Sequence, residues 1–228
     1  MPNKNVPARE TPGERIGKEE ETMEQQNAVP NGAIAVCPRK KNDKTPAVFY
    51  ADRMEFKGNV VPYNEVETIR IMGTSSEGTL LNNYNAYAMF TLTNGKKVTW
   101  TVRGAEFLGI GKAKMKQELY HAMFEVCMET VVKARANRYL EEIHNGRTVT
   151  IAKININSRD LTGKSFLKEV TVPFTELSGV ELWRGQIQIK NKEDKWAVNS
   201  PMTSQDNAIC LMPVIQTLIK EAAANQFV

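Results

Sequence analysis

The sequence predicts an α+β protein, mainly β, arranged as two similar units that each end in a helix. Residues 33–104 and 148–199 are rich in short apolar runs separated by turn residues, a pattern typical of small barrels or sandwiches. Each region is followed by a stretch with apolar residues every three to four positions, the period of a buried helix face. A motif of the first region also recurs in the second.

Residues 1–31 differ in composition from the rest of the chain. The segment contains four prolines and many Glu and Gln residues, and it has no aromatic residue. Such a composition buries too little apolar surface to offset the entropy of ordering the chain. We therefore expect a disordered N-terminal tail, which lacks the apolar stretch of a secretory signal.

The first predicted domain spans residues 32–144. Turns rich in Gly, Asn and Lys divide its first part into short strands, and the Gly/Ser/Asn-rich segment 73–83 is expected to be a loop. Asn94-Gly95 predicts a tight hairpin, because both central positions of a type I′ turn need positive φ. Residues 112–143 are expected to form one long helix that ends at Asn145-Gly146.

The second predicted domain spans residues 145–228. Its strands are expected between residues 148 and 199, with turns at Gly163-Lys164 and Arg184-Gly185. A final helix is expected from about residue 204 to residue 224, with Ser204 or Asn207 as its N-cap. Pro213 predicts a kink or a later start, because proline inside a helix removes a hydrogen bond and clashes with the preceding turn.

Short motifs recur in the two domains in the same order. The sequence VPYNEV (residues 61–66) aligns with VPFTEL (residues 172–177). Downstream, each domain carries a polar turn followed by a tryptophan, Trp100 or Trp196. These two residues occupy matching positions in the alignment, so we expect a shared role in the core. We infer that the domains are two copies of one unit.

The run VFYADRMEFKGNVVPYNEVETIRI (residues 48–71) resembles the core of pleckstrin-homology-like domains of the GRAM and bacterial types. Those domains share a hairpin, a turn and an aliphatic–Pro–aromatic step into the next strand. Residues 158–189 follow the same outline. The resemblance implies two tandem PH-like units, which are small seven-stranded barrels or bent sandwiches, each capped by a C-terminal helix.

A cluster of basic residues follows the first predicted strand and consists of Arg39, Lys40, Lys41 and Lys44. In pleckstrin-homology domains that bind phosphoinositides, basic residues of the corresponding loop hold the headgroup phosphates, so the resemblance implies a lipid- or anion-binding site here. The sequence departs from that pattern because the next strand has no basic residue before Arg53. A solvated turn without a ligand is the alternative interpretation.

Trp183 and Arg184 form a second candidate contact site. They lie side by side at an expected turn, where an exposed aromatic ring and a cation can contact a partner.

The sequence offers little material for catalysis. It has two histidines and three widely spaced cysteines without a CxxC pair, which argues against a zinc site or a disulfide framework. Two segments resemble phosphate loops but are incomplete. Gly163-Lys164-Ser165 lacks the glycine that the P-loop spacing requires five residues upstream, and Gly109-Ile110-Gly111-Lys112 lacks the Ser/Thr that binds Mg²⁺. We expect no catalytic residue, no metal site and no cofactor.

Charge and hydropathy narrow the class of partner. The net charge of +4 is too small to indicate nucleic-acid binding, and no run approaches the roughly 18 apolar residues of a membrane span. The sequence therefore predicts a cytoplasmic, non-catalytic scaffold that binds a protein, with β-augmentation at an open strand edge as one mode. Peripheral binding to anionic membrane lipid through the basic loop is the alternative.

Overall fold

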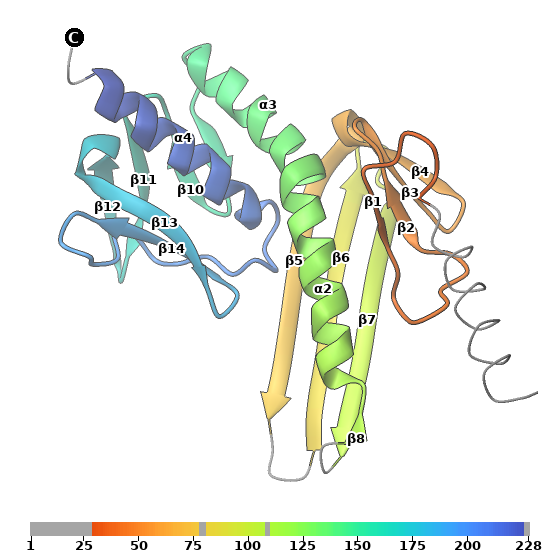
Figure 1. Cartoon of the computed structure of the whole chain (residues 1–228). Helices are drawn as coiled ribbons and strands as arrows, with labels where there is room; N and C mark the ends of the chain where they lie inside the picture. Colours follow the sequence, from red (N-terminus) through yellow and green to blue (C-terminus); the bar gives the residue numbers. More distant parts are fainter. Residues whose placement is uncertain (1–28, 78–80, 108–109, 226–228) are drawn as a thin grey trace, which may run out of the picture.

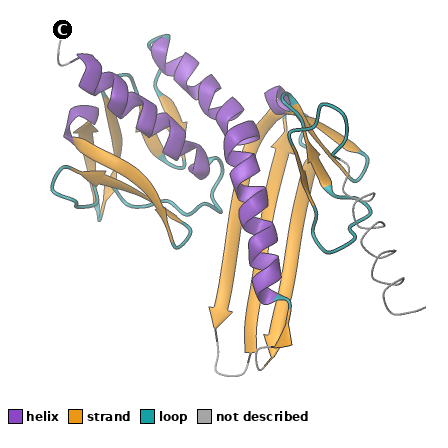
Figure 2. Cartoon of the chain, in the orientation of Figure 1, coloured by secondary structure: helices purple, strands orange, loops and turns teal. Residues whose placement is uncertain are grey.

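The computed structural model describes residues 29–77, 81–107 and 110–225 of the chain (Figure 1). The tail predicted for residues 1–31 lies outside the described residues, except for its last three positions. The protein is α+β and mainly β, as the sequence predicts, and each strand-rich region is followed by helix (Figure 2).

The first unit contains two antiparallel sheets joined by a short 3₁₀ helix. One sheet has the order β1 (Ala35–Cys37), β2 (Ala47–Phe49), β3 (Arg53–Phe56) and β4 (Asn59–Pro62). The 3₁₀ helix η1 (Tyr63–Glu65) leads into the other sheet, with the order β5 (Val66–Glu77), β6 (Leu81–Leu92), β7 (Lys97–Phe107) and β8 (Ile110–Gly111). The core between these sheets and the following helix includes Phe49, Met54, Ile69, Phe90 and Trp100.

A long helical segment covers the buried face of the second sheet (Figure 1). It consists of α2 (Ala113–Cys127), the π-helical turn η2 (Met128–Val132) and α3 (Lys133–His144). The helix predicted over residues 112–143 is thus present, but its π turn was not predicted. There the Thr130 hydroxyl donates a hydrogen bond to the Val126 carbonyl at 2.6 Å, which brings a side chain into the helix ladder.

The long helix ends where the sequence predicts. Gly146 has φ of 78°, and its N–H donates to the carbonyl of Ile143, while the N–H of Arg147 donates to the carbonyl of Glu142. This pair of bonds is the Schellman motif, which needs a left-handed residue after the last helical turn.

The second unit follows the same plan with shorter strands. One antiparallel sheet has the order β9 (Val149–Ile151), β10 (Ile154–Ile156), β11 (Asp160–Ser165) and β12 (Lys168–Pro173). The 3₁₀ helix η3 (Phe174–Glu176) leads into the hairpin of β13 (Leu177–Trp183) and β14 (Gln186–Asn191). The helices η4 (Ala208–Cys210) and α4 (Leu211–Ala224) follow, and α4 packs against β13, η3 and α3. The described strands of both units form open sheets, so the barrel alternative of the fold prediction is wrong.

The two VPxxE motifs produce the same local backbone geometry. At the corner before each 3₁₀ helix, the N–H of Tyr63 donates to the carbonyl of Asp52 at 2.9 Å, and the N–H of Phe174 donates to the carbonyl of Arg159 at 3.1 Å. The strand after each corner then starts with a register shift, between Val66 and Thr68 in the first unit and between Leu177 and Gly179 in the second.

Trp100 and Trp196 do not share a core position, so that prediction is wrong. Trp100 is fully buried and its indole N–H donates to the Cys37 carbonyl at 3.3 Å, whereas Trp196 is 56% exposed. The reason is register. The hairpin-closing bonds, Leu92 N–H to the Lys96 carbonyl and Asn191 N–H to the Lys195 carbonyl, align Trp196 with the exposed Lys97 rather than with Trp100.

Two further expectations about the first unit's hairpin differ from the structure. Asn94-Gly95 does form the hairpin turn, but only Gly95 has positive φ, so the turn is not type I′. The loop expected at residues 73–83 is instead the extension of β5 and β6, apart from residues 78–80, which lie outside the described part. The residues of this stretch have low strand propensity, but packing against tyrosine side chains stabilises the strand. Gly73 leaves room for this packing, because the Tyr120 ring and the Tyr84 hydroxyl both lie 2.9 Å from where a Cβ of residue 73 would be.

In the second unit, the turn expected at Gly163-Lys164 lies elsewhere. Both residues belong to β11, and the turn falls at Phe166-Leu167. A glycine is placed inside the strand because the side chain of Val198 lies 3.1 Å from where a Cβ would be.

Asn207 lies at the N-cap position before η4, as predicted, but its side chain makes no capping hydrogen bond and joins the two units instead. Its backbone is left-handed (φ 58°), and its side-chain oxygen accepts a hydrogen bond from Ile69 N–H at 2.9 Å. Its side-chain amide donates to the carbonyl of Glu67 and to the hydroxyl of Tyr139, both at 2.9 Å. Helical structure therefore starts only at Ala208, the later start that Pro213 allows because it lies in the first turn of α4.

Candidate functional site

β5 is an edge strand that is only partly covered. On the side away from β6, Ile69 N–H donates to the Asn207 side chain and Ile71 N–H donates to the Thr203 carbonyl at 3.2 Å. Because N–H groups alternate in direction along an antiparallel strand, those of Gly73 and Ser75 point to the same side. Within the described part of the chain, no backbone group pairs with them there. We call residues 72–76 the open edge; β5 is the outermost strand of its sheet in Figure 1.

One face of the β5–β7 sheet is exposed beside the open edge. Its residues alternate with the buried ones, as the two-residue period of a strand requires. We call it the outer face, and it comprises Thr68, Arg70, Met72, Thr74, Asn85, Tyr87, Met89, Thr91, Thr99, Thr101, Arg103 and Ala105. Met72 and Tyr87 are directly paired, and the Tyr87 hydroxyl lies 3.9 Å from the Met72 sulfur. Half-buried apolar side chains thus adjoin the open edge.

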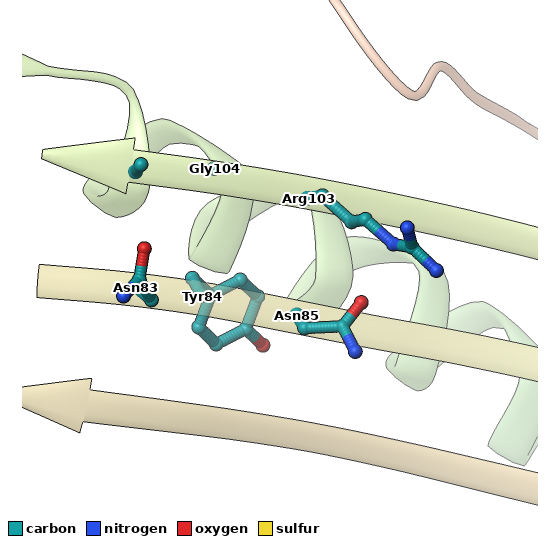
Figure 3. A pocket seen from close by; sticks show the side chains of 6 residues that line it. Asn83, Tyr84, Asn85, Arg103 and Gly104 are labelled. Carbon is teal, nitrogen blue, oxygen red and sulfur yellow. The ribbon is translucent and has the colours of Figure 1, made fainter.

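A shallow hollow of about 330 Å³ lies on this sheet between β6 and β7 (Figure 3). Its lining residues are Asn83, Tyr84, Asn85, Arg103, Gly104 and Ala105. Asn85 and Arg103 are paired across the two strands and project side by side. Among the described residues, no carboxylate lies within ion-pair distance of Arg103, so its guanidinium is available to a carboxylate or a carbonyl of a bound molecule.

The inner side of the same region is rigidly packed. The rings of Tyr84 and Tyr120 meet edge to face with centroids 6.1 Å apart, and burial raises the pKa of Tyr84 to about 12. A Cβ at Gly104 would lie 2.8 Å from the side chain of Lys116. Helix α2 therefore holds the sheet from behind, and the outer face is a fixed surface.

In the predicted basic loop, Arg39 has a structural role. Its guanidinium makes two bonds of 2.8–2.9 Å to the carboxylate of Asp43 and lies 5.2 Å from the centroid of the Phe56 ring. Burial opposes the charge on Asp43. The hydrogen bonds from the Arg39 side chain and from the backbone N–H groups of Arg39 and Thr45 outweigh it, and the pKa of Asp43 falls to about 2. The charge of Arg39 is therefore compensated within the loop.

The other residues of the predicted basic loop, Lys40, Lys41 and Lys44, are exposed. Two lysines from the start of α2, Lys112 and Lys116, lie near this loop. The Lys116 ammonium donates to the Arg39 carbonyl, and the pKa of Lys116 is lowered by burial and by the charges of Lys112 and Lys40. Such proximity could not be read from residues about 70 positions apart.

Trp183 and Arg184 lie at the tip of the β13–β14 hairpin, where the sequence predicts an exposed turn. Trp183 is 47% exposed, and the Arg184 guanidinium lies 4.6 Å from its ring centroid. Their contact with a partner stays a prediction.

Residues of the usual catalytic types are dispersed. Burial raises the pKa of the Cys37 and Cys210 thiols to about 12, and it raises that of Cys127 well above the ordinary value. His144 is exposed and lies 3.0 Å from Glu221, and His121 is exposed beside Gln117. No group of three or more His, Cys, Asp or Glu in the described ranges could hold a metal ion.

Searches against known proteins gave no relative: no protein-family model matches the chain, and no curated protein matches it. None of the described helices combines the length and the apolar character needed to cross a bilayer.

Proposed function

We propose that the protein is a non-catalytic binding module that takes up an extended segment of a partner protein as an additional strand on β5. The open edge is the observation that carries this proposal. It offers the unpaired backbone groups of Gly73 and Ser75 on a strand whose far side is fixed by β6. Backbone hydrogen bonds at such an edge give affinity, and the neighbouring side chains give specificity.

On this side of β5, the N–H groups of Ile69 and Ile71 already bond to a turn segment of the second unit. The segment from Thr203 to Asn207 lies against the first half of β5 and bonds to Ile69 and Ile71. A partner strand placed beside residues 72–76 would continue that arrangement along β5. Its alternate side chains would lie next to Met72 and Thr74 on the outer face, so an apolar residue opposite Met72 fits best.

The two units fit the proposal as PH-like copies with divergent tasks. The matching corner hydrogen bonds and the matching register shifts support a common origin. In this view the first unit binds the partner, and the second unit, through Thr203 and Asn207, sets where the open edge begins.

A library of displayed random peptides tests the proposal. Peptides selected on the full chain should bind the wild type and Ser75→Ala equally, because alanine keeps the edge N–H. Ser75→Pro removes that N–H at a position where an edge strand tolerates proline, and binding should fall by about tenfold or more. Selected peptides that bind Ser75→Pro as tightly as the wild type, or a library that yields no binder, would overturn the proposal. Circular dichroism checks that the variants fold.

The exposed Lys40 and Lys112, whose charges both act on the buried Lys116, favour a second candidate function, peripheral binding to anionic lipid at the basic loop. Arg39 is not part of this site, because its charge is paired with Asp43. Sedimentation with anionic vesicles at low salt tests it: Lys40→Gln/Lys41→Gln should reduce binding, and unchanged binding would remove the candidate.

A further inference from the structure

The β11–β12 hairpin ends in the two most exposed large apolar side chains of the described residues. Phe166 is 90% exposed and Leu167 is 98% exposed, and together they form the whole two-residue turn between Ser165 and Lys168. Both residues belong to the second unit.

The backbone conformation of the turn does not favour these two residues. Phe166 has φ of 54°, a left-handed conformation that Gly and Asn adopt much more readily than an aromatic residue. The β13–β14 hairpin and the β6–β7 hairpin each have a glycine with positive φ in the turn, Gly185 and Gly95. Neither backbone conformation nor packing within the chain therefore accounts for Phe and Leu at this tip.

Basic residues surround the tip. Lys164 and Lys168 are both exposed, and they lie on the two strands next to the turn. The acidic residue of this hairpin end is Glu169, which is paired across the strands with Lys164. With two lysines and one glutamate, the hairpin end next to the apolar tip has a net charge of +1.

The tip of the β13–β14 hairpin carries a further exposed aromatic ring and a cation, Trp183 and Arg184. One segment of the chain links the two hairpins. The Asn199 side chain accepts a hydrogen bond from Phe166 N–H at 3.1 Å, and Met202, three residues later, bridges to Gln186 next to the second tip.

We infer that the two hairpin tips of the second unit form a membrane-contacting surface for an anionic lipid bilayer. Phe166 and Leu167 enter the acyl region, and Trp183 lies at the interface, the depth that tryptophan prefers. Lys164, Lys168 and Arg184 face the lipid phosphates. A projecting apolar tip with cationic side chains next to it is complementary to an anionic bilayer, which is apolar inside and negatively charged at its surface. The inference is independent of the proposed β5 function.

Co-sedimentation with vesicles tests it. The full chain is mixed at low salt with vesicles of phosphatidylcholine alone and with vesicles that also contain phosphatidylglycerol. The wild type should bind the anionic vesicles and bind the neutral ones more weakly. Phe166→Gly/Leu167→Asn has residues suited to the turn, so the hairpin should stay folded, and the partition coefficient should fall by about tenfold or more.

Matched variants make the result specific. Ile34→Ser removes another exposed apolar side chain, far from the tip in sequence, and should bind as the wild type does. Lys164→Gln/Lys168→Gln should weaken binding to anionic vesicles, and the binding that remains should depend less on salt concentration than that of the wild type. The inference is overturned if the wild type binds neither vesicle, or if the tip double variant binds as well as Ile34→Ser. It is also overturned if only Lys40→Gln/Lys41→Gln abolishes binding, because the basic loop would then be the lipid site.

Discussion

The hairpin that follows the corner is long in the first unit and short in the second. In the first unit, β5 and β6 pair over twelve residues each and extend along α2. Within the described residues, the second half of β5 has no strand neighbour on the side away from β6. In the second unit, β13 and β14 have seven and six residues, and their outer neighbour is the segment that contains Trp196 and Met202. The same corner motif thus precedes an open strand edge in one unit and a compact tip in the other.

The repeated VPxxE motif determines the turn between two sheets. The exposed surfaces, in contrast, depend on the length of the strands after the motif and on the segments packed against them. The edge of β5 is open because Tyr84 and Tyr120 support a long strand behind Gly73. The tips of the second unit are exposed because none of the described helices covers the ends of its short hairpins. Four substitution experiments test this comparison, and they follow in decreasing order of predicted loss of stability.

Replacement of the two aligned tryptophans should have very different effects. Trp100→Ala should lower the free energy of unfolding by about 3–5 kcal/mol, because it leaves a cavity and an unpaired Cys37 carbonyl. Trp196→Ala should change it by less than about 0.5 kcal/mol, since the ring is mostly exposed. Equilibrium urea unfolding measures both, and similar losses would show that the register assignment is wrong.

Asn207→Ala should weaken the contact between the units. It leaves Ile69 N–H and the Glu67 carbonyl without their partner and places alanine at positive φ, which together should cost about 2–3 kcal/mol. The control is Asp206→Asn, which breaks the exposed ion pair with Arg70 and should cost less than about 1 kcal/mol. A loss for Asp206→Asn as large as that for Asn207→Ala would contradict the role assigned to Asn207.

Acid should destabilise the first unit through its β1–β2 loop, which has no counterpart in the tight β9–β10 turn of the second. The pKa of Asp43 in the folded protein, about 2, lies below its unfolded value of about 3.9, so its contribution is complete above pH 4 and is lost as the pH falls toward 2. We expect Asp43→Asn to cost about 2 kcal/mol at pH 7 and much less at pH 2.5. Urea unfolding at both pH values measures this, and an equal cost at both would refute the charge-based explanation.

Gly73→Ala should reduce stability by about 1–2 kcal/mol, because its Cβ would press on Tyr120 and Tyr84. Gly179→Ala in the corresponding strand of the second unit meets no atom within 4 Å and should be nearly neutral. Thermal unfolding compares the two variants. If Gly73→Ala were neutral too, the packing of α2 behind the open edge would be looser than described.

Local signals in the sequence were enough to predict much of the fold. Gly146 ends the long helix through one left-handed residue, and the VPxxE motifs define both corners. The strand extension at Gly73 and the π turn at Thr130 could not be predicted, because both depend on side chains packed from distant parts of the chain.

The candidate surfaces were predicted only in part. Trp183 and Arg184 are exposed at a turn, as expected, because adjacent residues at a hairpin end need no distant information. The open edge depends on how far Thr203 reaches along β5, which no local pattern reveals. The exposure of Phe166 and Leu167 was not predicted, because the turn was predicted at Gly163-Lys164. The sequence KSFLK between two alternating strands could have indicated the turn at Phe166-Leu167.

Amide hydrogen exchange, followed residue by residue by NMR, shows whether a bound peptide adds a strand to β5. In the free protein, the N–H groups of Thr74 and Ser76 point toward β6 and should exchange slowly, whereas those of Gly73 and Ser75 should exchange fast. Addition of a saturating selected peptide should slow exchange at Gly73 and Ser75 and leave Thr74 and Ser76 unchanged. If Gly73 and Ser75 still exchange fast while the peptide is bound, the partner does not add a strand to β5.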